Sequence, residues 1–262
     1  MNLDLKNKQA IVCGSTQGIG KAVAIELANL GAAVTLVARN EDALKATKQE
    51  LNTSAGQLHA YLCVDFSRPE ELKQIVEAYL QRQPGVHILV NNTGGPPAGP
   101  VISANTDEFV AAFNQHLICN HILVQACAEH MKNAKYGRII NIISTSVKAP
   151  LPNLGVSNTI RAAVANWSKT MANELGKFNI TVNNVLPGAT ATTRLKNIIE
   201  NNSAKTGRAT EDITHHMLSE IPMGRFAEAS EVAYAVAFLA SPAASYINGV
   251  NLPVDGGRTA NL

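Results

Sequence analysis

Three glycines near the N-terminus are spaced so that the backbone could bind a phosphate group. They occur in the segment Gly14-Ser15-Thr16-Gln17-Gly18-Ile19-Gly20, between a short apolar run and a helical pattern. Glycines let the backbone approach a diphosphate closely, and the free N–H groups of a helix N-terminus attract anions. The spacing G-x-x-x-G-x-G is a relative of the dinucleotide fingerprint G-x-G-x-x-G. A glycine-rich segment alone can be a plain turn, but this position between strand and helix predicts a phosphate-binding turn.

The residues that follow the second apolar run bear on the choice of dinucleotide. A carboxylate at the end of this strand would hold the adenosine ribose 2′-hydroxyl of NAD. Here the run ends in Val37-Ala38-Arg39-Asn40, without a carboxylate. An arginine pairs well with a 2′-phosphate through charge-assisted hydrogen bonds. We therefore expect Arg39 to select NADP, with NAD as the second choice. The alternative for Arg39 is a solvated side chain at a helix start.

The elements that must position these residues alternate along the chain. Short β-branched runs without polar alternation are typical of strands buried on both faces. The expected strands are Gln9–Cys13, Ala33–Ala38, Leu58–Val64, His87–Asn91, Arg138–Ile143, Thr181–Leu186 and Val250–Pro253. The expected helices are near Ile19–Leu30, Glu41–Asn52, Pro69–Gln81, Thr106–Lys132, Asn158–Phe178 and Ser230–Ala240.

Strand–helix alternation favours parallel strands joined by right-handed crossovers. We predict an α/β fold: a doubly wound, mostly parallel, seven-stranded Rossmann sheet with helices on both faces. No repeat or spacer divides the chain, so residues 1–262 are expected to form a single dinucleotide-binding domain. The polar, weakly helical sequence at 189–225 interrupts the alternation of strands and helices after the sixth strand. Such insertions often close over the ligand crevice, so we expect a substrate-side lid, with a solvated excursion as the alternative.

Composition excludes several classes of protein. Hydrophobic residues make up 46% of the chain and charged residues 16%, which argues against disorder. The net charge of +2 argues against a nucleic-acid-binding protein. The N-terminus lacks a signal pattern, and no apolar run approaches the roughly 20 residues of a membrane span, so no membrane association is expected.

The cysteines and histidines show no metal-ligand spacing. Cys13, Cys63, Cys119 and Cys127 are interpreted as reduced core thiols of a cytoplasmic protein. His215-His216, in the insertion, has no cysteine or acidic cluster beside it. We expect these two side chains at the lid or in solvent, and no metal site.

The sequence resembles the short-chain dehydrogenase/reductase family essentially from end to end. Beyond the glycine turn, the resemblance is carried by Asp65, Asn91-Asn92-Thr93-Gly94, Gly137-Arg138-Ile139-Ile140-Asn141-Ile142-Ile143-Ser144, Pro187-Gly188-Ala189-Thr190-Ala191-Thr192 and Asp255-Gly256-Gly257. It implies an NAD(P)-dependent oxidoreductase that acts on a small-molecule carbonyl substrate. It also implies a homotetramer or homodimer built on the two long helices and the C-terminal strand.

The resemblance assigns cofactor contacts to several of these residues. It implies that Asp65 contacts the adenine, and that Asn92 to Gly94 flank the adenosine ribose. It implies that Pro187 to Thr192, including Gly188, cradle the nicotinamide.

The catalytic residues depart from the family pattern, which uses an asparagine, a serine and a Tyr-x-x-x-Lys pair. Ser144 stands at the serine position and His116 at the asparagine position. Ser157 and Arg161 stand where the family has tyrosine and lysine. None of the five tyrosines has a lysine four residues later, so no shift in register restores the pair. The resemblance also assigns the cofactor ribose to Arg161.

These replacements weaken ordinary proton donation to a ketone. A serine hydroxyl is a far weaker acid than the tyrosine phenol, whose pKa is about 10, and an arginine does not relay protons near neutral pH. General acid–base catalysis is typically worth about 10² to 10⁴ in rate. Three candidates remain for stabilising a substrate oxygen. They are a hydroxyl pair of Ser144 and Ser157, a relay through His116, which is otherwise a structural histidine, and Lys148, which is otherwise a surface lysine.

Two functions are consistent with this residue set. The first is an NADPH-dependent reductase that transfers hydride to a carbonyl or to the β-carbon of a conjugated carbonyl. The latter needs mainly stabilisation of an enolate oxygen, with water protonating the carbon. The altered catalytic residues resemble a divergent 3-oxoacyl-acyl-carrier-protein reductase-like branch of the family, so a ketoacyl compound is a further possible substrate. The alternative is a catalytically silent NADP(H)-binding protein that senses the cofactor or supports a partner subunit.

Overall fold

The apolar runs form the strands of one parallel sheet. The computed structural model describes residues 1–261, and within them the sheet has seven strands in the order β3-β2-β1-β4-β5-β6-β7. Every neighbouring pair is parallel. The strands are β1 Gln9–Cys13, β2 Ala33–Ala38, β3 Ala60–Cys63, β4 Ile88–Asn91, β5 Gly137–Ile142, β6 Ile180–Pro187 and β7 Asn251–Val254. The predicted doubly wound fold is confirmed.

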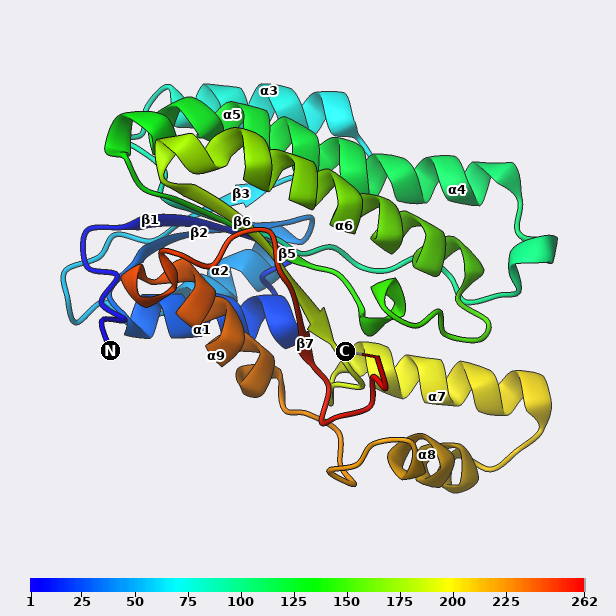
Figure 1. Ribbon diagram of the computed structural model, residues 1–262. Coiled ribbons are helices and arrows are strands. Elements are labelled where there is room, and N and C mark those ends of the chain that lie inside the picture. The colour runs from blue at the N-terminus through cyan, green and yellow to red at the C-terminus, as the bar shows by residue number, and fades with distance from the viewer. Residues whose placement is uncertain (262) are drawn as a thin grey trace.

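Helices cover both faces of the sheet (Figure 1). They are α1 Gly18–Asn29, α2 Glu41–Gln49, α3 Pro69–Leu80, α4 Thr106–Phe113, α5 Cys119–Ala134, α6 Gly155–Leu175, α7 Thr193–Thr206, α8 Thr210–Ser219 and α9 Ala229–Ala240. Helices α3, α4, α5 and α6 lie on one side, and α1, α2 and α9 lie on the other. Strand β1 sits between β2 and β4, so the strand order reverses there. In such sheets, ligands bind outside the carboxyl ends of the strands at this reversal.

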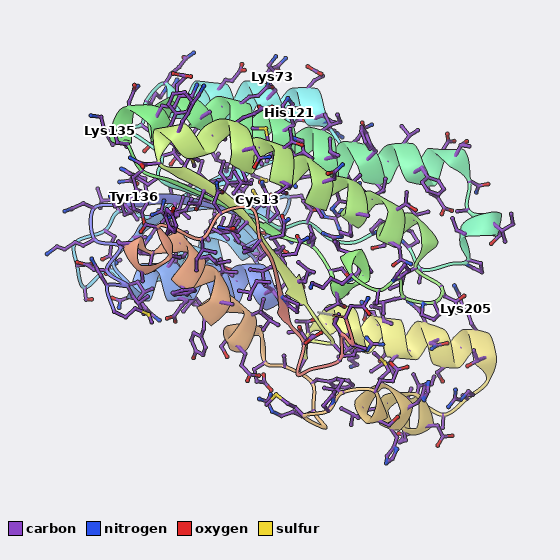
Figure 2. All side chains as sticks on the ribbon, viewed as in Figure 1. Cys13, Lys73, His121, Lys135, Tyr136 and Lys205 are labelled. Atoms are coloured by element: carbon purple, nitrogen blue, oxygen red, sulfur yellow. The ribbon has the colours of Figure 1, made fainter. Side chains whose placement is uncertain are left out.

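Consecutive strand residues pack into opposite halves of the core. Ile139 belongs to the apolar cluster under α3, α5 and α6, whereas the next residue, Ile140, belongs to the cluster under α1 and α9. Both side chains are buried, which explains why the strands read as continuous apolar runs. Cys13 lies within this layered core, whereas Lys73 and Lys205 lie on the outside of the molecule (Figure 2).

The third strand is shorter than the predicted Leu58–Val64. It spans Ala60–Cys63 at the edge of the sheet, where it pairs with β2 alone. Leu58 is 89% exposed, and Cys63 is exposed as well. The assignment of all four cysteines to the core was therefore wrong for Cys63, because an edge strand has no neighbour to cover its outer side. The other three cysteines are buried, and all four are free thiols.

The long helix predicted over Thr106–Lys132 is divided into two. A π-helical turn, Asn114–Ile118, separates α4 from α5 and holds His116. Such turns insert one residue into a helix and often occur at functional sites. Single-sequence periodicity did not indicate the turn, because the apolar pattern continues through it.

Candidate active site

The glycine turn presents an uncapped helix N-terminus. Gly14 and Gly18 have positive φ angles of 59° and 52°, which other residues rarely adopt. Gln17, the N-cap of α1, makes no capping hydrogen bond with its side chain, and the first turn of α1 contains no acidic residue. The N–H groups at this end are thus not satisfied by the helix's own side chains. This donor set suits the diphosphate of a dinucleotide.

The loop after β4 closes against the glycine turn. The Asn92 amide Nδ2 donates to the carbonyl oxygens of Cys13 and Gly14, at 3.2 and 3.3 Å. A Cβ atom on Gly20 would lie 2.1 Å from the Gly14 carbonyl oxygen and 2.6 Å from Asn92 Nδ2, so a larger residue there would displace both the turn backbone and the amide. The Asn92 side chain therefore holds the turn in place. The Asn92 backbone and Gly94, which has no atom of residues 1–261 within 4 Å of its Cβ position, are left for the predicted contact with a ribose.

Three other residues of the turn have different surroundings. Ser15 is fully buried, and its Oγ accepts a hydrogen bond from the Val37 N–H at 3.0 Å. This contact fixes the turn to β2. Ile19 packs against the apolar core, whereas Gln17 is exposed.

The carboxyl ends of β2 and β3 place Arg39 and Asp65 near each other. Arg39 is exposed, and no ion pair within residues 1–261 involves it. Asp65 accepts a hydrogen bond from the Ser67 N–H at 2.9 Å. This bond, with smaller contributions from the Ser67 side chain and the charges of Arg39 and Arg68, lowers the pKa of the Asp65 carboxyl. The edge thus carries an ionised carboxylate and an unpaired guanidinium.

Helix α6 places Ser157 and Arg161 one helical turn apart, near the end of β5. Arg161 is 8% exposed, and its Nη1 donates to the Ile142 carbonyl at 2.9 Å. Ser144 follows two residues after Ile142, and its Oγ accepts from the Ser146 N–H at 3.1 Å. Its hydroxyl proton remains available to another acceptor. Ser157 is also 8% exposed.

His116 is buried and uncharged. Its Nδ1 lies 2.6 Å from the Thr93 hydroxyl, and the side chain is 2% exposed. Burial, followed by the charges of Arg161 and Arg194, lowers the pKa of His116 to about 2. His116, Arg161 and Arg194 therefore share one electrostatic environment, although they come from three separate elements.

Within residues 1–261, the positive charges of the buried Arg161 and the exposed Arg194 have no acidic partner. None of the ion pairs within the described part of the chain includes Arg161 or Arg194. Burial, and then the charge of Arg194, lower the pKa of Arg161 to about 10, so it stays protonated at neutral pH. Arg161 Nε and His116 Nε2 are buried without a hydrogen-bond partner in residues 1–261. The interaction with Arg194 was not predicted from the sequence.

A row of asparagines holds the strands that carry these loops. Asn91, Asn141, Asn184 and Asn251 occupy matching positions on β4, β5, β6 and β7. Their amides are linked by hydrogen bonds of 2.8, 3.1 and 2.8 Å. The sequence shows an asparagine in each of these strands, but only the strand register shows that the four side chains meet. The row fixes where β4, β5 and β6 end relative to one another, and therefore where Asn92, Ser144 and Pro187 lie.

The predicted insertion contains α7 and α8, and its two ends are joined. The Ala191 N–H donates to the Ala227 carbonyl at 2.8 Å, and the Ala227 N–H donates to the Ala189 carbonyl at 3.0 Å. Thr192 caps α7 through the Leu195 N–H, and a Cβ on Gly18 would lie 3.2 Å from Thr192 Cγ2. The insertion therefore begins beside the glycine turn and extends past the carboxyl ends of the strands (Figure 1).

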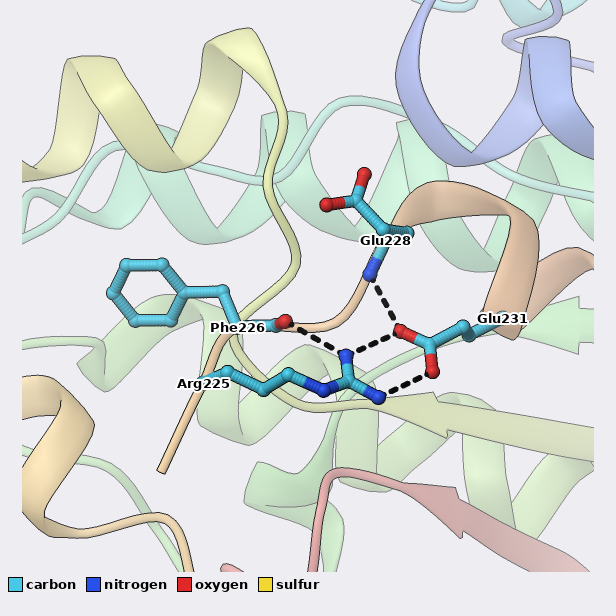
Figure 3. Close-up of polar contacts among 4 residues, drawn as sticks. All are labelled: Arg225, Phe226, Glu228 and Glu231. Carbon is cyan, nitrogen blue, oxygen red and sulfur yellow. Dashed lines mark hydrogen bonds and ion pairs between the residues drawn. The ribbon is translucent and has the colours of Figure 1, made fainter. Parts of the chain in front are cut away.

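The return of the insertion is held by an ion pair (Figure 3). Arg225 donates to both carboxylate oxygens of Glu231, at 2.7 and 2.6 Å, and to the Phe226 carbonyl at 3.1 Å. Glu231 also accepts from the Glu228 N–H. The Arg225 contact and the Glu228 hydrogen bond lower the pKa of Glu231 to about 2. This pair fixes the point where the insertion enters α9.

The other residues singled out in the sequence lie at the end of β6, after β5 and on α8. Pro187 ends β6, and a Cβ on Gly188 would lie 2.7 Å from Asp255 Cβ, so Gly188 permits close approach to the segment after β7. Lys148 is partly buried, and its carbonyl accepts from Asn261 at 2.9 Å. His215 and His216 are exposed on α8. Residues 1–261 contain no His, Cys, Asp and Glu grouping suited to a metal, and no helix among them is long and apolar enough to span a membrane.

Comparison with known proteins gives matches over nearly the whole chain. NADPH-dependent reductase BacG of Bacillus subtilis (strain 168) is 30% identical over 259 residues, which cover 98% of this chain and 100% of BacG. The 3-oxoacyl-[acyl-carrier-protein] reductase FabG of Pseudomonas aeruginosa is 32% identical over 257 residues, covering 97% and 98%. L-sorbose reductase from Gluconobacter frateurii, solved with NADPH and L-sorbose, superposes with a TM-score of 0.93 at 30% identity, over 100% of both chains.

A family model described as enoyl-(acyl carrier protein) reductase matches residues 14–259. The match includes the glycine turn, the asparagine row and the insertion. With these relatives, it confirms the family that the motifs indicated: the chain belongs to the short-chain dehydrogenase/reductase family.

Proposed function

We propose that the protein is an NADP(H)-dependent oxidoreductase that reduces a carbonyl or conjugated carbonyl group of a small molecule. The observation that carries this proposal is the buried Arg161 cation, which is hydrogen-bonded to Ile142 at the end of β5, two residues before Ser144. A positive charge and hydroxyl donors at this position suit an oxygen that gains negative charge during hydride transfer.

NADP(H) is supported by the residues around the glycine turn and by the relatives. The α1 N-terminus would hold the diphosphate, and the unpaired Arg39 would hold the 2′-phosphate. Asp65, Gly94 and the segment from Pro187 to Thr192 would contact the rest of the cofactor. BacG is named as NADPH-dependent, and L-sorbose reductase was solved with NADPH. When bound, the cofactor supplies the hydride.

The catalytic set of this proposal lacks the tyrosine and lysine of the family. Ser144 and Ser157 donate hydrogen bonds to the substrate oxygen, and Arg161 supplies a positive field and also contacts the cofactor ribose. Arg161 stays charged even with a pKa of about 10, so it does not deliver the proton. His116 is neutral, with its Nδ1 2.6 Å from the Thr93 hydroxyl. A relay through it requires one ring nitrogen to gain a proton as the other loses one, without an imidazolium.

This residue set favours a conjugated carbonyl over an isolated ketone. Hydride addition to the β-carbon produces an enolate, whose oxygen needs stabilisation but no immediate proton. Two hydroxyl donors and a buried cation provide that stabilisation, and water then protonates the carbon. Reduction of a ketone would instead require a proton at the oxygen during the transfer.

The proposal extends to the insertion and to assembly. Residues 189–225, pinned at their base, serve as a lid on the substrate side. Exposed apolar side chains on and beside α4, including Val110 and Phe113, support self-association as a homotetramer or homodimer. Free cysteine thiols support a cytoplasmic location.

The replaced tyrosine and lysine favour one rival, a catalytically silent NADP(H)-binding protein. NADPH oxidation against a panel of ketones and enones separates the two. We expect turnover of at least one class, and about a hundredfold loss in Ser144→Ala. Tight NADPH binding with no oxidation of any compound would refute the reductase and leave the silent protein.

A further inference from the structure

The segment after β7, residues 255–261, begins with a compact turn. The Asp255 carboxylate accepts hydrogen bonds from the Gly257 N–H at 3.0 Å and from the Thr259 N–H at 2.9 Å. The Arg258 N–H donates to the Asp255 carbonyl at 3.3 Å. A carboxylate that accepts from nearby backbone N–H groups fixes the local path of the chain. Figure 1 shows this segment, in red, turning back after β7 on the side of the molecule that holds α7 and α8.

The turn packs against the end of the insertion. The Met223 N–H donates to the Gly256 carbonyl at 3.2 Å. Gly256 has a φ angle of 64°, and a Cβ atom on it would lie 2.8 Å from Ile221 Cγ2, so a side chain there would displace Ile221. The Arg258 guanidinium forms an ion pair with the carboxylate of Glu220, the residue that follows α8. Backbone and side-chain contacts thus join the end of the insertion to the segment after β7.

The same segment reaches the loop that carries Ser144. The Asn261 Nδ2 donates to the Lys148 carbonyl at 2.9 Å, although the two residues are 113 positions apart. Lys148 is the C-cap of the 3₁₀ turn Thr145–Val147, and Ser144 is its N-cap. The Ser144 Oγ accepts from the Ser146 N–H within this turn. A hydrogen bond to Lys148 therefore restrains the turn that orients the Ser144 hydroxyl.

A different contact holds the start of the insertion. Arg194, in the first turn of α7, donates from Nη1 to the Gly95 carbonyl at 3.1 Å and from Nη2 to the Pro96 carbonyl at 3.5 Å. Gly95 and Pro96 lie in the loop after β4. The loop after β4 thus holds one end of the insertion, and residues 255–261 hold the other. Because residues 255–261 also contact the Ser144 loop, they join two walls of the proposed substrate site.

We propose that residues 255–261 are a strap that holds the end of the insertion beside the Ser144 loop, with Arg258 and Asn261 as its positioning residues. This inference rests on the proposed function, which assigns Ser144 and the insertion to the substrate site. Both residues act through the segments that they hold. The side chains of Arg258 and Glu220 are 21% and 41% exposed, so their ion pair is a modest contribution. Its loss should open the insertion locally without unfolding the protein.

Hydrogen–deuterium exchange of the cofactor-free protein tests the strap without turnover. We expect Arg258→Gln to raise the exchange rate in residues 216–224 about 3- to 5-fold, the effect of a lost, partly exposed ion pair. Glu220→Gln should match it, and the double variant should exchange no faster than either single variant. Arg258→Lys keeps the charge and should restore most of the protection. Asn261→Asp, which replaces the donor amide by an acceptor, should raise exchange in residues 145–149.

Lys196→Gln is the matched control for Arg258→Gln. Lys196 forms an exposed ion pair with Glu200, at 3.8 Å, and both residues lie on α7. The change removes a pair that lies within one helix of the insertion, so exchange in residues 216–224 should stay the same. Unchanged exchange in the strands establishes that each variant is folded. Equal exchange in wild type and Arg258→Gln, or an equal rise in Lys196→Gln, would overturn the strap.

Steady-state kinetics with the best enone of the panel provide the second readout. Arg258→Gln should raise KM about 3- to 5-fold with kcat unchanged, because a loosened insertion lowers the fraction of protein that is ready to bind substrate. Asn261→Asp should instead lower kcat about 3- to 5-fold with KM unchanged, because it releases the turn that orients Ser144. NADPH affinity should be the same in both variants and the wild type.

The outcomes separate the strap from the reductase. Faster exchange in Arg258→Gln and Asn261→Asp, with no enone or ketone reduced, would uphold the strap and refute the reductase. Reduction of the enone with kcat and KM unchanged in both variants would uphold the reductase and overturn the positioning role of the strap.

Discussion

Replacing Arg161 by methionine should remove activity with little loss of stability. The lowering of its pKa from 12.5 to about 10 corresponds to a penalty of about 3 kcal/mol on the charged form in the folded protein. Its hydrogen bond to the Ile142 carbonyl, at 2.9 Å, offsets about 2 kcal/mol of that penalty. Because the two effects nearly cancel, we expect Arg161→Met to change the free energy of unfolding by less than about 2 kcal/mol. Turnover should fall at least about a hundredfold.

Arg138→Met is the matched control for this variant. Arg138 is 3% exposed, donates to the carbonyls of Ser241, Gly137 and Asn179, and lies 4.2 Å from the Tyr136 ring centroid. Burial lowers the Arg138 pKa, but three hydrogen bonds and the Tyr136 ring hold its charge, so its loss should cost about 3 kcal/mol or more.

Urea unfolding of the cofactor-free protein, followed by circular dichroism, measures both variants. A loss above about 2 kcal/mol in Arg161→Met would refute the reasoning, because it would mean that the folded protein gains more from this cation than its burial costs. Equal losses in the two variants would refute it as well.

Three further changes test other parts of the site. His116 has a pKa of about 2 when folded and about 6.5 when unfolded, so the unfolded state binds more protons as the pH falls below 6.5. The free energy of unfolding of the wild type should therefore fall by about 1 to 2 kcal/mol between pH 7 and pH 5, measured by urea titration. In His116→Gln this fall should be absent, and pH profiles that run parallel in the two proteins would contradict the prediction. Arg39→Asp should weaken NADPH binding about 30-fold or more and spare NADH in fluorescence titrations, whereas equal weakening of both would show that Arg39 does not contact the 2′-phosphate. Gly20→Ala should destabilise the protein by about 1 to 3 kcal/mol in thermal unfolding, because its Cβ would lie 2.1 Å from the Gly14 carbonyl oxygen. Gly99→Ala, with nothing within 4 Å of its Cβ, should be neutral, and similar shifts for both would rule out the packing argument.

The strands and the phosphate-binding turn were predictable because their signals are local. A buried parallel strand requires a continuous apolar run, and a close backbone approach requires glycine, so Gln9–Cys13 and the turn after it follow from residue types alone. The family motifs then placed Asn92 and Ser144 just after the fourth and fifth strands, where the structure has them.

The charge environment of the site was not predictable, because it depends on contacts between distant segments. Nothing in the sequence near Arg194 shows that it reaches the Gly95 carbonyl, 99 residues away. The surroundings of His116 likewise depend on a π-helical turn that the apolar periodicity does not indicate. The exposure of Cys63 follows from the position of β3 at the sheet edge, which strand order decides.

The central claim is that the protein transfers hydride with serine hydroxyls and a buried cation in place of tyrosine and lysine. The most direct test is a single-turnover experiment, in which NADPH-loaded protein is mixed with the best enone of the panel and NADPH absorbance is followed. The account predicts loss of one NADPH per site, about a hundredfold slower in Ser144→Ala. Stable absorbance in the wild type, with NADPH bound, would contradict it.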